Sequence, residues 1–254
     1  MAVKKAEGII LRKYLLRETS FLIVLFTKEF GKIRGVIKGI RSPYPQFAGN
    51  FEIFNHVEIL FYAKKRKLMD LITQCDTIDF FLPLRKDILR LTYANYFIEL
   101  IDKVTNDYDP NEKMFTLLAE TLKKLGTESS AKRISRVFEI KLLTEIGMSP
   151  QLEGCVRCGK EICETSKFDI SQGGLVCEKC APGKDPKSGI LLGTINFIKK
   201  IQSTDLAKSY QIKVSHQVGV ETEMILRDFI RFHVNKPIKS LDFLDRITAQ
   251  KIVA

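Results

Sequence analysis

The sequence contains few histidines and no long hydrophobic run. Its three histidines, His56, His216 and His233, lie far apart and fit no metal-binding or catalytic pattern, so no local motif supports a hydrolase. The longest uninterrupted apolar run is Phe21 to Phe26, far short of the roughly 20 residues that a membrane-spanning helix needs. The N-terminus also lacks the apolar segment of a signal peptide. We therefore expect a cytoplasmic protein.

The sequence also lacks internal repeats and low-complexity tracts. Hydrophobic residues make up 45% of the 254 residues and charged residues 28%, which excludes a disordered chain and allows at least one sizeable core. Acidic residues are in deficit, with 30 Asp and Glu against 41 Lys and Arg, so the net charge is +11. A charge of this sign favours a polyanionic partner.

Residues 1 to 80 alternate between apolar and polar side chains, with frequent turn signals, which is typical of β-strands. The alternation predicts strands at residues 8–16, 21–27, 32–40, 51–61 and 68–74. Five strands in so short a segment favour a small closed barrel. Gly31, Gly35 and Gly39 recur at every fourth residue and suit the bends by which such a barrel closes.

From Pro83 onwards the apolar period changes from two to about 3.6, which indicates helices. The pattern predicts helices at residues 83–105, 110–126, 130–147, 194–201 and 218–234, with Gly126 ending the second and Ser129 or Ser130 capping the third. We therefore predict an α+β protein. A barrel domain (residues 1–80) precedes a helical domain (residues 81–254).

Five of the six cysteines lie between residues 155 and 180. Cys155 and Cys158 form one CxxC pair, and Cys177 and Cys180 form a second after 18 residues, a spacing typical of zinc sites. Four thiolates close the coordination sphere, so the sequence predicts a structural Zn²⁺ in a module at about residues 150–190. A redox pair is the alternative. The nearby Cys163 is interpreted as a bystander that is also able to replace a ligand.

Basic residues gather at two places in the predicted barrel. Residues 1 to 80 carry 14 Lys and Arg against 8 Asp and Glu, a net charge of +6. If the barrel is an OB-fold, its second and third strands and the loop between its fourth and fifth strands are the usual oligonucleotide surfaces. On these surfaces we predict DNA contacts by Lys32, Arg34, Lys38, Arg41, Lys64, Lys65, Arg66 and Lys67. A solvated hairpin tip is the alternative for the last four.

Two other functions remain open at this stage. Asp70, Asp76 and Asp79 suggest a metal-dependent nuclease, although they match no recognisable ligand set. A zinc-containing RNA-binding module would share the same charge and fold.

Several segments in sequence order resemble the RecO family of bacterial recombination mediator proteins. They are the glycine-spaced basic strand at 31–41, the helix from Pro83, the segment from Phe138 to Pro150, the two CxxC pairs with Gly173-Gly174-Leu-Val-Cys177, and Lys239-Ser-Leu-Asp-Phe243. The resemblance covers nearly the whole chain. It implies an N-terminal OB-fold, a helical C-terminal domain with a zinc module, and no enzyme activity.

The same resemblance implies a function in DNA repair at the bacterial nucleoid. Such proteins bind single- and double-stranded DNA, anneal complementary strands, and act with RecR to help RecA replace single-strand-binding protein. Within the helix predicted at 130–147, a basic and apolar cluster suits an acidic peptide with an aromatic end, such as the tail of single-strand-binding protein. The cluster comprises Lys132, Arg133, Arg136 and Leu143, beside Phe138.

Overall fold

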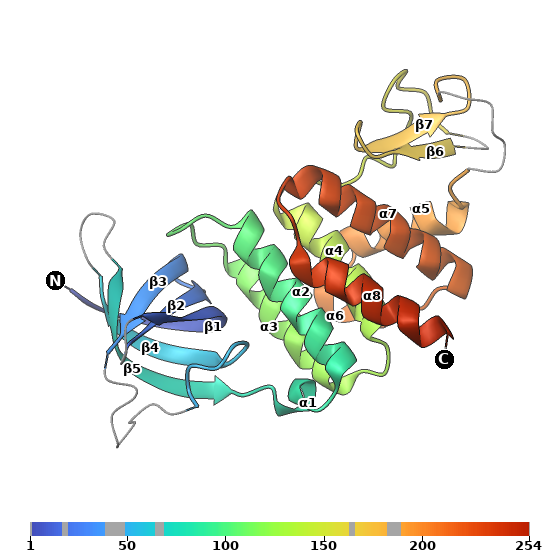
Figure 1. Cartoon of the computed structure of the whole chain (residues 1–254). Helices are drawn as coiled ribbons and strands as arrows, with labels where there is room; N and C mark the ends of the chain where they lie inside the picture. Colours follow the sequence, from blue (N-terminus) through green and yellow to red (C-terminus); the bar gives the residue numbers. More distant parts are fainter. Residues whose placement is uncertain are drawn as a thin grey trace. The chain divides into compact units, whose positions relative to one another are not determined.

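The computed structural model describes residues 2–16, 20–38, 49–63, 69–162, 166–181 and 189–253. The chain forms two compact units, of which the first comprises Met1–Ser129 with Ile238–Ala254 and the second comprises Ser130–Pro237. The barrel thus shares its unit with the first helices and the last one (Figure 1). Within the described ranges, every helix is too short or too polar to cross a membrane.

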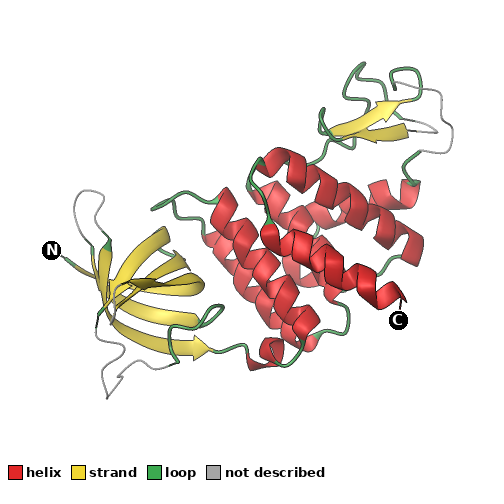
Figure 2. Cartoon of the chain, viewed as in Figure 1, coloured by secondary structure: helices red, strands yellow, loops and turns green. Residues whose placement is uncertain are grey.

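The N-terminal strands form the predicted closed barrel (yellow in Figure 2). The strands follow the order β1-β2-β3-β5-β4, and β4 pairs back onto β1. Only the β3–β5 pairing is parallel, and it spans just Gly35–Asp70 and Val36–Leu71. The strands are β1 (Val3–Leu16), β2 (Ser20–Thr27), β3 (Gly31–Ile37), β4 (His56–Tyr62) and β5 (Asp70–Asp79).

Alternate residues of these strands point into the barrel and form its hydrophobic core, because successive side chains of a strand face opposite sides. The glycines of β3 serve two different purposes. Gly31 has φ +66°, a conformation that favours glycine, whereas a Cβ on Gly35 would lie only 2.5 Å from the Ile72 side chain. Gly39 lies outside the described residues. The core comprises Ala6, Ile10, Ile23, Leu25, Ile33, Ile37, Phe51, Val57, Ile59, Phe61, Ile72 and Cys75.

In its described residues the first unit also contains the helices α1 (Leu82–Arg85), α2 (Ile88–Val104), α3 (Glu112–Thr127) and α8 (Lys239–Val253). The prediction of one helix from residue 83 is wrong at its start, because Asp87 caps a new helix by accepting from the N–H groups of Leu89 and Arg90. Gly126 does not end α3. The helix continues through it to Thr127, and a Cβ there would make an ordinary contact of 3.4 Å with Cβ of Pro83.

The sequence pattern did not predict α8. This helix packs on α2, where the Glu99 carboxylate accepts hydrogen bonds from the backbone N–H of Ser240 at 2.8 Å and of Lys239 at 3.3 Å. Burial opposes ionisation, but the hydrogen bonds from Ser240, together with the charge of Lys103 and the N–H of Lys239, outweigh it and lower the pKa of Glu99. The carboxylate therefore stays charged and anchors the N-terminus of α8.

The second unit contains four helices and one hairpin in its described part: α4 (Ala131–Glu145), β6 (Ser166–Asp169), β7 (Gly174–Cys177), α5 (Leu192–Ser203), α6 (Leu206–Ser209) and α7 (His216–Val234). Ser130 caps α4 as predicted, since its Oγ accepts from the Arg133 N–H at 3.3 Å. Asn235 ends α7 with φ +48°. The β6–β7 hairpin lies between α4 and α5 in the chain (Figure 1), and Cys177 is the last residue of β7.

Candidate metal centre and nucleic-acid interface

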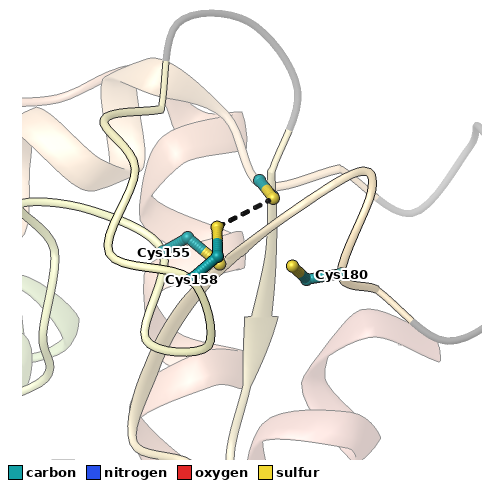
Figure 3. Close-up of side chains that lie close together, drawn as sticks. Cys155, Cys158 and Cys180 are labelled. Carbon is teal, nitrogen blue, oxygen red and sulfur yellow. Dashed lines mark hydrogen bonds between the residues drawn. The ribbon is translucent and has the colours of Figure 1, made fainter.

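The structure brings Cys155, Cys158, Cys177 and Cys180 together (Figure 3). Their four Sγ atoms all lie within 4.8 Å of one another, and Cys158 Sγ lies 3.8 Å from Cys177 Sγ. A disulfide bond would require about 2.05 Å. A tetrahedron with Zn–S bonds of about 2.3 Å has edges of about 3.8 Å, so the spacing fits a four-thiolate metal site.

Two tight turns create this arrangement. The first carries Cys155 and Cys158 and closes through the Gly159 N–H, which donates to the Cys155 carbonyl at 2.8 Å. The second follows β7, and the Cys180 N–H donates to the Cys177 carbonyl at 3.0 Å. Gly159 has φ +72°, and so the conformation of the first turn requires a glycine at this position.

Neighbouring groups tie the two turns together. Arg157 donates to the Cys180 carbonyl and to Asp169 on β6, both at 2.8 Å. The backbone N–H of Cys177, with smaller help from those of Cys158 and Arg157, lowers the pKa of the Cys155 thiol to about 6. The thiolate is the form of cysteine that binds a metal. The donor set therefore suits a thiophilic cation.

Contacts with α7 hold the hairpin in place within the second unit. Phe168 on β6 packs edge-on against Phe229, with ring centroids 5.8 Å apart. His233 Nε2 lies 3.0 Å from the Ile170 carbonyl oxygen. The cysteine centre is thus connected to the helices, while Cys163 lies outside the described residues.

The outer face of β3 carries two exposed cations in its described part. Arg34 lies in the middle of the strand with its side chain 54% exposed, and its Nε is 3.1 Å from Asp107 Oδ2. Lys38 follows directly after the strand and is exposed. The other basic residues predicted to contact DNA, namely Arg41, Lys64, Lys65, Arg66 and Lys67, lie outside the described residues.

The position of Lys32 corrects the expectation that it faces DNA. Lys32 is only 5% exposed, because the end of α2 and the α2–α3 loop cover this end of β3. Its ammonium group donates to the carbonyl oxygens of Asp102 at 2.6 Å and Thr105 at 2.8 Å, and to Asp102 Oδ1 at 3.2 Å. With three acceptors for its three N–H groups, Lys32 is a structural residue here.

The three carboxylates considered for a nuclease have separate structural roles. Asp70 is buried and accepts the Tyr108 hydroxyl at 2.5 Å, whereas Asp79 accepts the Phe81 N–H at 2.7 Å in the turn after β5. Asp76 is exposed. Within the described ranges, the four cysteines are the only group of three or more potential metal ligands. The arrangement gives no support to the nuclease hypothesis.

The predicted peptide site on α4 also needs correction. Leu143 is 1% exposed and belongs to the core, while Arg136 is 9% exposed and donates to the Gly219 carbonyl on α7 at 2.9 Å. A Cβ on Gly219 would lie 3.2 Å from this guanidinium, so the glycine makes room for it. Only Lys132 is exposed, with Arg133 half-buried. The spacing of side chains along α4 does not show that α7 covers the side of α4 that carries Arg136.

Comparison with known proteins gives matches over both halves of the chain. The family model for the N-terminal part of recombination protein O matches residues 1–81, and that for its C-terminal part matches residues 85–242. Curated relatives carry the name DNA repair protein RecO. The protein from Symbiobacterium thermophilum is 28% identical over 99% of this chain and 100% of its own length. The one from Desulforamulus reducens is 32% identical (97% and 96%), and that from Roseiflexus sp. is 31% identical (96% and 86%).

Proposed function

The chain belongs to the RecO family of DNA repair proteins, and from this we propose that it is a recombination mediator that binds single- and double-stranded DNA and anneals complementary strands. The observation that carries the proposal is the family match over residues 1–81 and 85–242. The family name gives a role in DNA repair and no catalytic activity. The closed barrel with exposed cations on β3 supports DNA binding of the OB-fold type.

We place the proposed DNA contacts on the barrel, at Arg34 and Lys38 together with Arg41 and the lysine-rich run Lys64 to Lys67. These cations would neutralise phosphates and release counterions, which makes affinity fall steeply with salt. Annealing then follows from charge neutralisation and proximity of the two strands. Residues 1–80 and 81–254 are proposed as the DNA-binding and partner-binding domains, acting at the nucleoid in the cytoplasm.

The central test is annealing of complementary oligonucleotides coated with single-strand-binding protein, without nucleotide. We expect wild type to anneal them and the triple variant Arg34→Ala, Lys38→Ala, Arg41→Ala to be at least tenfold slower, because phosphate contacts on the barrel are lost. Circular dichroism and thermal unfolding of the same samples establish that the variant is folded.

Failure of folded wild type to anneal the strands would contradict the mediator proposal. The alternative of an RNA-binding module is tested by competition between DNA and RNA strands of equal length and sequence. Tighter binding of the RNA would favour that alternative. Equal annealing by wild type and the triple variant would remove the DNA contact from this face of the barrel.

We further propose that the helical domain binds protein partners, namely RecR and the acidic tail of single-strand-binding protein, and thereby helps to load RecA. Lys132 is the exposed cation of the predicted site on α4, and Arg133 beside it is half-buried. We expect Lys132→Ala with Arg133→Ala to weaken binding of a labelled tail peptide about fivefold or more, since charge-assisted contacts are lost. Lys200→Ala, on α5, is the matched control. Unchanged affinity in the folded double variant would exclude this site.

We also propose that the four-cysteine centre holds a structural Zn²⁺. Cys155, Cys158, Cys177 and Cys180 would supply four thiolates and close the coordination sphere, so the ion would stabilise the fold and leave no position for a reactive water. The spacing of the four Sγ atoms supports this assignment.

A further inference from the structure

The loop between α2 and α3, residues 105–111, lies along the first half of β3, where β5 does not pair with it. Asp107 forms an isolated parallel bridge with Lys32, and the Tyr108 N–H donates to the Lys32 carbonyl at 2.9 Å. A Cβ on Gly31 would lie 2.1 Å from the Asp109 carbonyl oxygen, so the loop touches the strand directly. The loop therefore covers an edge of the barrel that β5 leaves open.

Tyr108 fixes the conformation of this loop. Its backbone has φ +58°, which is uncommon for a residue other than glycine and costs free energy. Its hydroxyl donates to Asp70 Oδ2 at 2.5 Å, at the start of β5. Burial, together with the Asp70 carboxylate, raises the pKa of Tyr108, so the hydroxyl remains a donor. The loop is thus tied to both β3 and β5.

Asp107 is the residue of this loop that reaches the proposed DNA surface. Its Oδ2 lies 3.1 Å from Arg34 Nε, and both side chains are about half exposed, at 43% and 54%. A carboxylate and a phosphate compete for the same guanidinium donors. A DNA phosphate that binds Arg34 must therefore displace Asp107 or share the guanidinium with it.

We propose that Asp107 is an internal competitor for Arg34 and sets the affinity of the barrel for DNA. The inference rests on the proposed DNA-binding function and deepens it, because it names a residue that limits binding. Wild-type DNA binding would either break the Arg34–Asp107 ion pair or leave the phosphate and the Asp107 carboxylate sharing one guanidinium group. The loop tether at Tyr108 keeps Asp107 in place, so competition is present at every encounter with DNA.

The test measures affinity for a mixed-sequence single-stranded oligonucleotide by fluorescence anisotropy at two salt concentrations. We expect Asp107→Asn to bind about two- to fivefold more tightly, the range that corresponds to an exposed ion pair. Asp109→Asn is the matched control. It removes the same charge at a position two residues further along the loop, and the Asp109 side chain is exposed but forms no ion pair with Arg34. We expect a smaller gain for it. In an Arg34→Ala background, Asp107→Asn should raise the affinity for DNA by no more than Asp109→Asn does.

Several outcomes would overturn the inference. Equal gains for Asp107→Asn and Asp109→Asn would mean that net charge alone matters. Unchanged affinity of Asp107→Asn, when Arg34→Ala weakens binding, would reject the competition and leave the proposed function intact. Wild-type affinity of Arg34→Ala would instead reject the β3 contact itself. Equal melting temperatures of wild type and Asp107→Asn confirm that the loop is undisturbed, and a fall would count against the proposal.

Discussion

Cys155→Ser is expected to abolish metal binding and unfold the cysteine module, while the barrel unit stays folded. Each strand of the β6–β7 hairpin has only four residues, and an isolated two-stranded hairpin is marginally stable at best. Structural zinc contributes about 10–16 kcal/mol of apparent binding free energy at neutral pH. The packing of Phe168 on Phe229 is far too small to replace it.

The measurements are metal content per chain and limited proteolysis. We expect one Zn²⁺ per chain in wild type and none in Cys155→Ser, with new cleavage within residues 151–181. Single-stranded DNA affinity should change by less than about twofold, because the first compact unit contains none of the four cysteines. Substitutions remote from a contact surface usually have only small effects of this size.

Cys75→Ser is the matched control, since Cys75 is also buried but belongs to the barrel core. It should keep the full metal content. Wild type purified without metal, and unable to bind added Zn²⁺, would contradict the assignment. Full metal content in Cys155→Ser would instead mean that another thiol, such as Cys163, serves as a ligand.

Local patterns predicted most of the fold because they report which face of an element is apolar. Alternation gave all five barrel strands and their closure, although the fourth strand begins at His56 and not at residue 51, and the CxxC spacing gave the cysteine centre. The fifth strand was placed at 68–74 but spans Asp70–Asp79, because its second half carries exposed polar residues on both faces. The prediction located α7 and its end at Asn235 well, since the cap chemistry is local.

The sequence patterns failed where a residue's environment is set by a neighbouring helix or strand. Arg136 on α4 has the sequence context of a surface cation, yet Gly219 on α7 leaves room for it to be buried. No periodicity within one element encodes such a neighbour. The acidic cluster at Asp107 and Asp109 was the available signal for the loop on β3.

Comparing Lys32→Met with Lys38→Met distinguishes a lysine that stabilises the fold from a lysine that binds DNA. The Lys32 side chain is 7% exposed and its ammonium group satisfies two carbonyl oxygens and Asp102. Removing one partner of a buried charged contact costs about 3–5 kcal/mol, because the remaining groups stay buried without it. Arg12, whose Nε is 2.6 Å from Asp102 Oδ2, retains part of that compensation. We therefore expect a loss of about 3 kcal/mol in the free energy of unfolding.

For a unit of this size, that loss corresponds to a melting temperature lower by about 6–12 °C. Lys38→Met should leave the unfolding free energy within about 0.5 kcal/mol of wild type, as is usual for exposed positions, and weaken single-stranded DNA binding. Urea unfolding and anisotropy on the same samples measure both quantities. The two lysines have the same parity in the predicted strand at 32–40, so alternation alone assigns them the same face and the same role. If Lys32→Met unfolded like wild type and lost DNA affinity as Lys38→Met does, the alternation would be right and the burial of Lys32 beneath the α2–α3 loop would be wrong.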